Sequence, residues 1–186
     1  MSEYTTDEQI AAQVLRVPEM FGFLIDRYEK KLDRYILRKT SLDYDLRQDI
    51  LQEVFLKSYQ NIASFDPKLS FNSWIYRICH NTIINDWKKN KRYREGVSFD
   101  SEASDYLLNL FSEESTVHEV DVQYDSKRLR AALDSLKGKY RDIVILRYAE
   151  ELSYDEIADV LKLPPGTVAT NLSRAKKKLR TLLDTK

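Results

Sequence analysis

The sequence predicts an all-α chain in which two small helical domains are joined by an acidic flexible linker. Only 4 Gly and 4 Pro occur among 186 residues, which favours long helices over turn-rich β structure. Apolar residues recur at helical spacing through most of the chain. Residues 95–125 contain no Lys or Arg and many acids, so we place the domains at residues 10–94 and 126–183, on either side of this linker.

Three amphipathic helices are expected in the first domain, over residues 21–40, 45–63 and 71–92. A loop precedes the third, because Pro67 biases Asp66 away from helical geometry. The predicted inward positions are Phe21, Leu24, Ile25, Tyr28, Leu32, Tyr35 and Ile36, then Ile50, Leu51, Val54, Phe55, Tyr59 and Ile62, and then Trp74, Ile75, Ile78, Ile83, Ile84 and Trp87. Inside the linker, residues 106–111 form an apolar island, which is either a short docking helix or a transient one.

The second domain is expected to end in a helix-turn-helix. One helix carries Leu129, Leu133 and Leu136, and another covers residues 139–148. Ser153 and Glu156 then have the spacing of a capping box, which starts a helix at Ser153. Pro and Gly at residues 164–166 end this helix and form a turn before the next one. The last helix has apolar positions at Val168, Leu172, Ala175, Leu179 and Leu182.

The opposite side of this last helix is basic, which is typical of a helix that enters the major groove of duplex DNA. We expect the start of the helix, including Thr167, Thr170, Asn171 and Arg174, to be exposed toward base edges or phosphates. Arg174 can read guanine and Asn171 adenine. The lysines that follow, Lys176, Lys177 and Lys178, are expected to neutralise phosphates without selecting sequence.

A second candidate site lies between residues 65 and 94, where aromatic residues alternate with amides and end in a basic run. Aromatic side chains stack on unpaired bases, and amides hydrogen-bond base edges. Asn81 and Asn85 lie one helical turn apart, so both can face one ligand. The alternative is that Trp74 and Trp87 are core residues, which their periodicity favours.

Charge and composition narrow the remaining classes of function. The net charge of +0 conceals two basic poles around the acidic linker. Cys79 is the only cysteine, so no intrachain disulfide is possible, and with no signal-like N-terminus we expect a cytoplasmic protein. Adjacent Cys79 and His80 point about 100° apart on a helix, which argues against a metal or nucleophile pair. We expect neither enzymatic activity nor a cofactor.

Three segments together resemble an RNA polymerase sigma factor of the extracytoplasmic-function (ECF) subfamily. They read DILQEVFLKSYQNIASFDP, FNSWIYRICHNTIINDWKKNKR and LSYDEIADVLKLPPGTVATNLSRAKKKL. The resemblance covers residues 21–94 and 129–183, which it implies are sigma regions 2 and 4. The family usually carries basic residues directly after Gly-Thr-Val, whereas this chain has Ala169, Thr170 and Asn171.

The resemblance also implies site residues and partners. Asp49, Gln52 and Glu53 match the Asp-x-x-Gln-Glu pattern that binds the clamp of core RNA polymerase. The loop at residues 65–70 is similar to the family's pocket for a flipped base of the minus-ten element, and the last helix would read the minus-thirty-five element. The full minus-ten set implied is Phe65, Lys68, Ser70, Trp74, Asn81, Asn85, Lys88, Lys89, Lys91 and Arg92.

The chain is therefore expected to be a promoter-specificity subunit that binds core polymerase, duplex promoter DNA and the melted strand, and that is controlled by an anti-sigma protein. Two alternatives stay open from the residues alone. One is a stand-alone helix-turn-helix regulator with a helical dimerisation domain. The other is a helical adaptor with no role in DNA binding.

Overall fold

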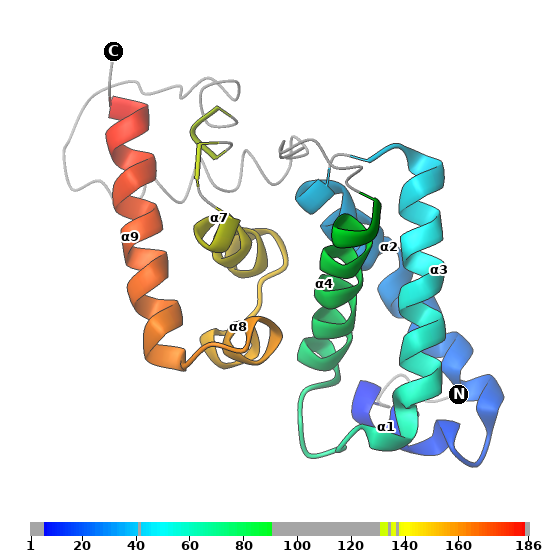
Figure 1. The fold of residues 1–186 in the computed structure, drawn as a ribbon. Helices are drawn as coiled ribbons and strands as arrows, with labels where there is room; N and C mark the ends of the chain where they lie inside the picture. Colours follow the sequence, from blue (N-terminus) through cyan, green and yellow to red (C-terminus); the bar gives the residue numbers. More distant parts are fainter. Residues whose placement is uncertain (1–5, 41, 91–130, 134, 137, 185–186) are drawn as a thin grey trace.

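The computed structural model describes residues 6–40, 42–90, 131–133, 135–136 and 138–184. Every regular element in these residues is helical, which confirms the all-α prediction. Figure 1 shows two groups of helices side by side. The first contains α1 (Asp7–Val14), η1 (Pro18–Met20), α2 (Phe21–Thr40), α3 (Tyr44–Asn61), η2 (Ile62–Ser64) and α4 (Phe71–Asn90), and the second contains α7 (Gly138–Val144), the π-helix η3 (Ile145–Ala149), α8 (Tyr154–Leu161) and α9 (Pro165–Asp184).

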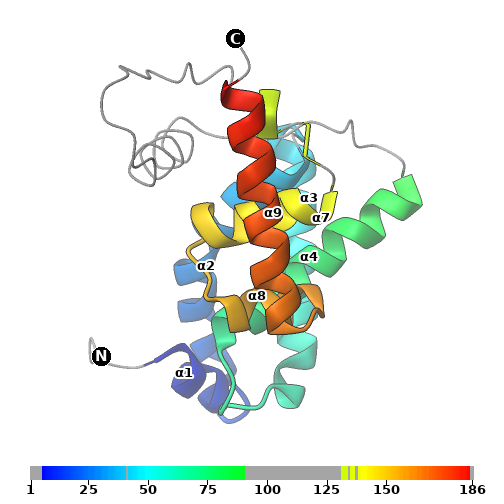
Figure 2. The same cartoon turned by 90° about the vertical axis from the view of Figure 1, so that its left-hand side faces the viewer.

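In the first group, α2, α3 and α4 pack around a core in which most predicted inward residues are buried. Tyr59 and Trp87 are exceptions, with exposed fractions of 43% and 48%. The ring of Tyr59 lies at the rim of the core, edge-on to Phe21 at a centroid distance of 5.3 Å. Trp87 lies near the end of α4, which projects beyond the other helices (Figure 2). Helical spacing predicted both positions inward, and this was wrong: Tyr59 is covered on one side only, and Trp87 lies where α4 extends past its neighbours.

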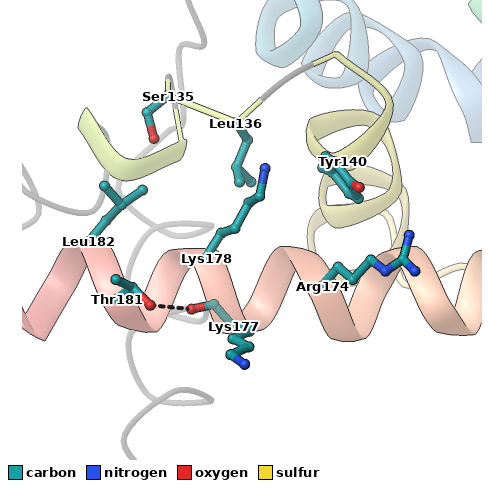
Figure 3. Close-up of a pocket in the computed structure, with 8 residues that line it drawn as sticks. All are labelled: Ser135, Leu136, Tyr140, Arg174, Lys177, Lys178, Thr181 and Leu182. Atoms are coloured by element: carbon teal, nitrogen blue, oxygen red, sulfur yellow. Dashed lines mark hydrogen bonds between the residues drawn. The ribbon is translucent and has the colours of Figure 1, made fainter.

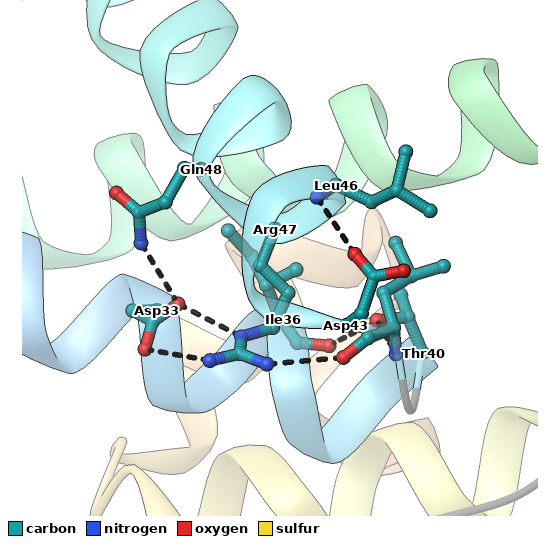
Figure 4. A network of polar contacts seen from close by, with 8 residues as sticks. Asp33, Ile36, Thr40, Asp43, Leu46, Arg47 and Gln48 are labelled. Carbon is teal, nitrogen blue, oxygen red and sulfur yellow. Dashed lines mark hydrogen bonds and ion pairs between the residues drawn. The ribbon is translucent and has the colours of Figure 1, made fainter.

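A network of hydrogen bonds holds the turn between α2 and α3, and so sets the direction of α3 (Figure 4). Arg47 donates from Nε to Asp33 on α2 at 2.9 Å and from Nη1 to the carbonyl of Leu42 at 3.0 Å. Asp43 is the N-cap of α3, since its side chain accepts from the backbone N–H of Leu46 at 3.0 Å. The face of α3 that carries the candidate polymerase residues is thereby fixed relative to α2.

The second group contains the predicted helix-turn-helix. Ser153 and Glu156 form the expected capping box at the start of α8. Lys162 then ends α8 in the left-handed region at φ 54°, and the chain turns into α9. The last inward residue of α9 is Leu183, at 3% exposure, while Leu182 is 43% exposed. The inward face of α9 therefore continues from Leu179 to Leu183, four residues later, and the predicted inward position of Leu182 is wrong.

The two groups are in contact, because α8 packs against α4 and η3 against α2. Arg38 on α2 lies 2.7 Å from Glu150, and both side chains are almost completely buried. Several earlier expectations fall on residues outside the described part of the chain. These are the acidic linker at 95–125, its apolar island at 106–111, the helix position Leu129, and the basic residues Lys91 and Arg92.

Candidate nucleic-acid and polymerase interface

A hollow between α3 and α4 brings together two of the predicted DNA-contacting amides. Asn81 and Asn85 lie one turn apart on α4 and are both exposed. The opposite wall comes from α3 and η2, so the site is composite. The cavity has a volume of about 330 Å³ and is lined by Lys57, Asn61, Ser64, Trp74, Ile78, Asn81, Thr82 and Asn85.

Three amides and one ammonium group border this cavity, which is a donor and acceptor set suited to the edge of a nucleobase. Lys57 donates to Thr82 at 3.4 Å and forms an ion pair with Glu53 at 2.7 Å. Asn61 donates to the carbonyl of Lys57 at 2.8 Å, and among the described residues its side-chain oxygen accepts no hydrogen bond. Lys57, Asn61, Ser64 and Thr82 were missed by the sequence analysis, which considered the amides of one helix only.

The aromatic residues of this region pack around Trp74, which lines the cavity. Phe65, Phe71 and Trp74 contact one another with ring centroids 5.3–5.4 Å apart, and Phe71 also meets Tyr28 at 5.5 Å. The exposed fractions of Phe65 and Trp74 are 8% and 6%. Neither ring therefore offers the open face that stacking on a base requires, because each is packed on aromatic neighbours; Trp74 instead fits the alternative of a core residue. Trp74 still contributes part of the cavity wall.

The loop before α4 carries two polar residues of the predicted minus-ten set, Lys68 and Ser70. Lys68 is exposed, and its backbone N–H donates to Asp66 at 3.0 Å, which orders the loop. The hydroxyl of Ser70 donates to Glu156 of α8 at 2.7 Å, so this candidate DNA contact is occupied by the second group of helices. Lys88 and Lys89, in the last turn of α4, are exposed and complete a basic end.

The candidate polymerase residues lie on the outer side of α3. Asp49 and Gln52 are exposed, and Glu53 is half-buried and bound to Lys57. Leu56 lies one turn beyond Gln52 and has an exposed fraction of 57%. Exposed acids beside an exposed leucine form a surface that a basic and partly apolar partner helix can bind.

The basic residues of α9 border a shallow groove on the surface of the second group of helices. Arg174 and Lys177 are exposed, and Lys178 lies 4.9 Å from the ring centroid of Tyr140 on α7. Figure 3 shows Lys178 pointing from α9 toward Leu136 and Tyr140, while Lys177 points away from them. A groove of about 550 Å³ runs along this side of α9, with apolar residues at its base and Arg174, Lys177 and Lys178 around it. Lys176 is half-buried over the ring of Tyr148, at 5.7 Å.

The exposure predicted for Asn171 is wrong. Its exposed fraction is 5%, because it lies three residues after Val168 and four before Ala175, on the inward face of α9. Thr167 is half-buried, and Thr170 is exposed with its hydroxyl donating to the carbonyl of Gly166 at 2.8 Å. Of the two base-reading candidates on α9, only Arg174 is exposed.

Two buried titratable groups lie on α4. Nδ1 of His80 and the hydroxyl of Tyr35 form a hydrogen bond of 2.8 Å. Burial together with the charge of nearby Lys39 lowers the pKa of His80 to about 4. Burial raises the pKa of Cys79 well above its ordinary value, which keeps this thiol protonated and unreactive. In the described residues no group of three or more His, Cys, Asp or Glu side chains could hold a metal ion, and no helix is long and apolar enough to cross a bilayer.

Comparison with known proteins matches both groups of helices to one class. Residues 24–93 match the family model for sigma-70 region 2, and residues 126–179 match the model for sigma-70 region 4. A fold made of these two regions defines a sigma factor. The match to region 2 also disfavours the alternative of a stand-alone helix-turn-helix regulator, because in that alternative the first domain serves dimerisation.

Relatives over nearly the full length narrow the class. The chain is 30% identical over 165 residues to the ECF RNA polymerase sigma factor SigW of Bacillus subtilis, covering 87% of this chain and 88% of the relative. It is also 30% identical over 183 residues to the ECF RNA polymerase sigma-E factor of Haemophilus influenzae, covering 95% and 94%. The chain belongs to the ECF sigma factors. It is a promoter-specificity subunit of RNA polymerase, which directs initiation by recognising and helping to melt promoter DNA.

Solved structures agree on the fold. The chain matches the structure of CnrH in complex with the cytosolic domain of CnrY with a TM-score of 0.68 and 23% identity, over 96% of this chain and 97% of that one. It matches the sigma factor RpoE in complex with the anti-sigma factor NepR from Bartonella quintana with a TM-score of 0.63 and 22% identity, over 90% and 98%.

Proposed function

We propose that the two groups of helices divide promoter recognition, with residues 10–94 holding polymerase and the melted minus-ten strand, residues 126–183 holding the duplex minus-thirty-five element, and residues 95–125 linking them. The cavity between α3 and α4 carries this proposal. Its amides and Lys57 converge on a space of about 330 Å³, enclosed on one side by the Trp74 ring. A single unpaired base inserted there would exchange hydrogen bonds with water for hydrogen bonds with these amides.

The other contacts follow from exposure and charge. Lys68, Lys88 and Lys89 are exposed on the same domain and are suited to phosphates that flank the flipped base. Lys91 and Arg92 continue this basic run in the sequence. On α9, Arg174 is the candidate for base reading, and Lys177 and Lys178 neutralise phosphates. Asp49, Gln52 and Glu53 bind the clamp of core polymerase.

We further propose that the protein acts in the cytoplasm, catalyses no reaction of its own and is held inactive by an anti-sigma protein. Polymerase supplies the chemistry of nucleotide addition. The strand opening to which this chain contributes is driven by binding energy, since extruding one base costs only a few kcal/mol. The match to RpoE bound to the anti-sigma factor NepR supports a partner of that kind.

Reconstitution tests this proposal. The purified chain is added to core polymerase, and specific initiation is scored on a library of random promoter fragments. We expect initiation at a shared pair of sequence elements and loss of core binding in the variant Asp49→Ala/Gln52→Ala. Gln60→Ala, at an exposed position near the end of the same helix, is the matched control. Absence of both core binding and initiation by the unaltered chain would refute the proposed function.

A further inference from the structure

The N-terminal helix α1 precedes the residues 24–93 that match sigma-70 region 2, yet it is built into the first group of helices. Its start is fixed by a capping box, in which the hydroxyl of Thr6 accepts from the backbone N–H of Gln9 and the Gln9 side chain accepts from the backbone N–H of Thr6. Its apolar side packs against α2 and α4. The buried residues on that side are Ile10, Ala11 and Val14. The first turn of α1 is therefore held in a defined place against the domain.

This first turn carries two acids, and Asp7 ties it to α2. The hydroxyl of Tyr28 donates to Asp7 at 2.7 Å, and Arg27 donates to the same carboxylate at 2.5 Å. Burial and the hydrogen bond to Asp7 raise the pKa of Tyr28, so its hydroxyl stays protonated and donates. The Tyr28 ring in turn meets Phe71 at a centroid distance of 5.5 Å. Asp7 thus orients α1 against the aromatic residues around Trp74.

The second acid, Glu8, reaches the start of α4. Its Oε1 accepts from the backbone N–H of Phe71 at 3.0 Å, across 63 residues of sequence. The N–H groups in the first turn of a helix have no partner within the helix and form its positive end, so a carboxylate there supplies both a hydrogen bond and a favourable charge. Ser70 caps the same turn from the loop, since its hydroxyl accepts from the backbone N–H of Ser73 at 3.3 Å. Glu8 is thus a second cap for α4, supplied by another helix.

The cap lies where the loop at residues 65–70 joins α4. The loop starts at Phe65, whose ring is edge-on to Phe71 at 5.3 Å and meets Trp74 at the same distance. Trp74 lines the α3–α4 cavity, and Asn81 lines it two turns further along α4. The cavity lining comes from α3, η2 and α4, so Glu8 acts on it through the residues that it holds. Glu8 therefore supports the end of the loop from outside the cavity.

Loss of this cap is expected to have a local effect. Helix α4 has 20 residues and packs on α3, so one missing hydrogen bond at its start does not unfold it. The first turn instead opens more readily, as helix ends do when they lack partners. Such opening displaces the end of the loop and Phe71, while Asn81 and Asn85 stay in place. Recognition of a base suffers, because a binding site must hold all its groups in one geometry.

We propose that Glu8 is a positioning residue for minus-ten recognition, which holds the junction of the 65–70 loop and α4 in the geometry that receives the extruded base. Asp7 supports this role by fixing the turn of α1 that carries Glu8. The inference rests on the proposed function for its consequence in promoter DNA, whereas the cap is a property of the free chain. It adds a specificity-determining residue from a helix that precedes the residues matched to region 2.

The test compares two substitutions of Glu8 with a control of matched charge. Glu8→Ala removes the acceptor, whereas Glu8→Gln loses the charge and keeps a side-chain oxygen for the N–H of Phe71. Glu19→Ala removes the same charge from an exposed position on η1.

Amide hydrogen exchange at residues 71–73 is measured first, in each free, full-length chain. We expect exchange about fivefold faster in Glu8→Ala, and changes of less than about twofold in Glu8→Gln and Glu19→Ala. Exchange in Glu8→Ala equal to that of the unaltered chain overturns the cap. This measurement needs neither DNA nor polymerase.

Base discrimination by the holoenzyme is measured second. Open-complex formation is compared on one promoter that the unaltered chain uses, with each possible base at the extruded position. We expect Glu8→Ala to reduce the ratio between the preferred base and the others by about fivefold, and Glu8→Gln and Glu19→Ala to change it by less than about twofold. The affinity for core polymerase should change by less than about twofold in every variant.

A purely structural role of Glu8 would give a different result. It would lower open-complex formation on all the templates alike and leave the ratio unchanged, and that outcome overturns the positioning role. Failure of the two proposals is distinguishable. Initiation by the unaltered chain with an unchanged ratio in Glu8→Ala overturns this inference alone, whereas absence of specific initiation by the unaltered chain refutes the proposed function and the consequence drawn from it.

Discussion

The two helices that we propose to contact DNA, α4 and α9, have the same length and differ in how much of their surface is buried. Helix α4 is enclosed by α3, α8 and the aromatic cluster, and even Ser73, His80 and Thr82 on it are buried. Helix α9 buries one apolar face and leaves Arg174 and Lys177 exposed. An enclosed helix with a small polar cavity suits one extruded base, and an open basic helix suits a continuous duplex. This difference in packing is what we expect if α4 binds a melted strand and α9 binds duplex DNA.

The largest expected effect comes from truncating Phe71, which packs on Trp74, the aromatic residue that lines the cavity. Phe71 is completely buried and contacts Tyr28, Phe65 and Trp74. Truncation of a buried Phe to Ala usually costs about 3–5 kcal/mol. We expect Phe71→Ala to lower the free energy of unfolding of the first domain by about this amount, as measured by urea denaturation followed by circular dichroism. A loss below about 1 kcal/mol would mean that the cluster does not hold the cavity in shape.

The second largest effect is expected from acidification, which should destabilise the first domain. His80 is buried neutral with Tyr35, Lys39 and Asp142 around it, and its pKa is lowered to about 4. A lowered pKa means that the unfolded chain binds the proton first, so the stabilisation is present above about pH 6.5 and is lost as the pH falls toward 4. The loss attributable to His80 is at most about 3 kcal/mol. The free energy of unfolding is measured from pH 7 to pH 4 for the unaltered chain and for His80→Gln. The free energy should fall less steeply with pH in the variant, because this histidine no longer takes up a proton on unfolding.

Asn81→Ala should separate strand opening from polymerase binding. Asn81 is exposed at the cavity, so its loss removes a candidate hydrogen bond to the extruded base, at about 1–3 kcal/mol. Open-complex formation should fall by about tenfold or more, while the affinity for core polymerase should change by less than twofold. An equal loss of both would indicate a folding defect instead.

Arg174→Ala tests base reading by the open helix. If Arg174 reads a base, promoters that depend on the minus-thirty-five element should weaken by about 1–3 kcal/mol, and others should not change. Asn171→Ala is the contrasting variant, because Asn171 is buried and should affect stability more than promoter preference. No change at any promoter for Arg174→Ala would reject its role in base reading.

Lys177→Ala should have the smallest effect. Lys177 is exposed and points away from α7, as expected for a contact with phosphate. Its loss should weaken binding nearly uniformly across sequences and reduce the salt dependence of duplex affinity by about one phosphate contact. The check is a titration of a duplex fragment at several salt concentrations, and a sequence-dependent loss would contradict this assignment.

Local signals in the sequence predicted most of the helices. The capping box of Ser153 and Glu156 and the break at residues 164–166 define the helix-turn-helix through neighbours in the chain. Asn171 was predicted on the wrong face, although it lies three residues after Val168 on the inward stripe of α9. Its polar character outweighed its position in the prediction, and a stricter count of helical spacing could have placed it correctly.

The composite parts of the site could not be predicted in the same way. Lys57 and Asn61 reach the cavity from α3, 24 and 20 residues before Asn81, and only the packing of α3 on α4 brings them there. The contacts of Glu156 with Ser70 and Asn72 cross between the two groups of helices, at sequence separations of 86 and 84. No periodicity or motif within one helix carries information on either arrangement.

The most direct test of the contrast between α4 and α9 is site-specific crosslinking in a promoter open complex. A photoreactive amino acid replaces Asn61, at the edge of the α3–α4 cavity, or Ser173, on the exposed side of α9. We expect the probe at position 61 to crosslink to unpaired bases of the minus-ten region on one strand, and the probe at position 173 to crosslink only to duplex DNA near minus thirty-five. Crosslinking of position 61 to duplex DNA, or of position 173 to the melted strand, would contradict this division of the two helices.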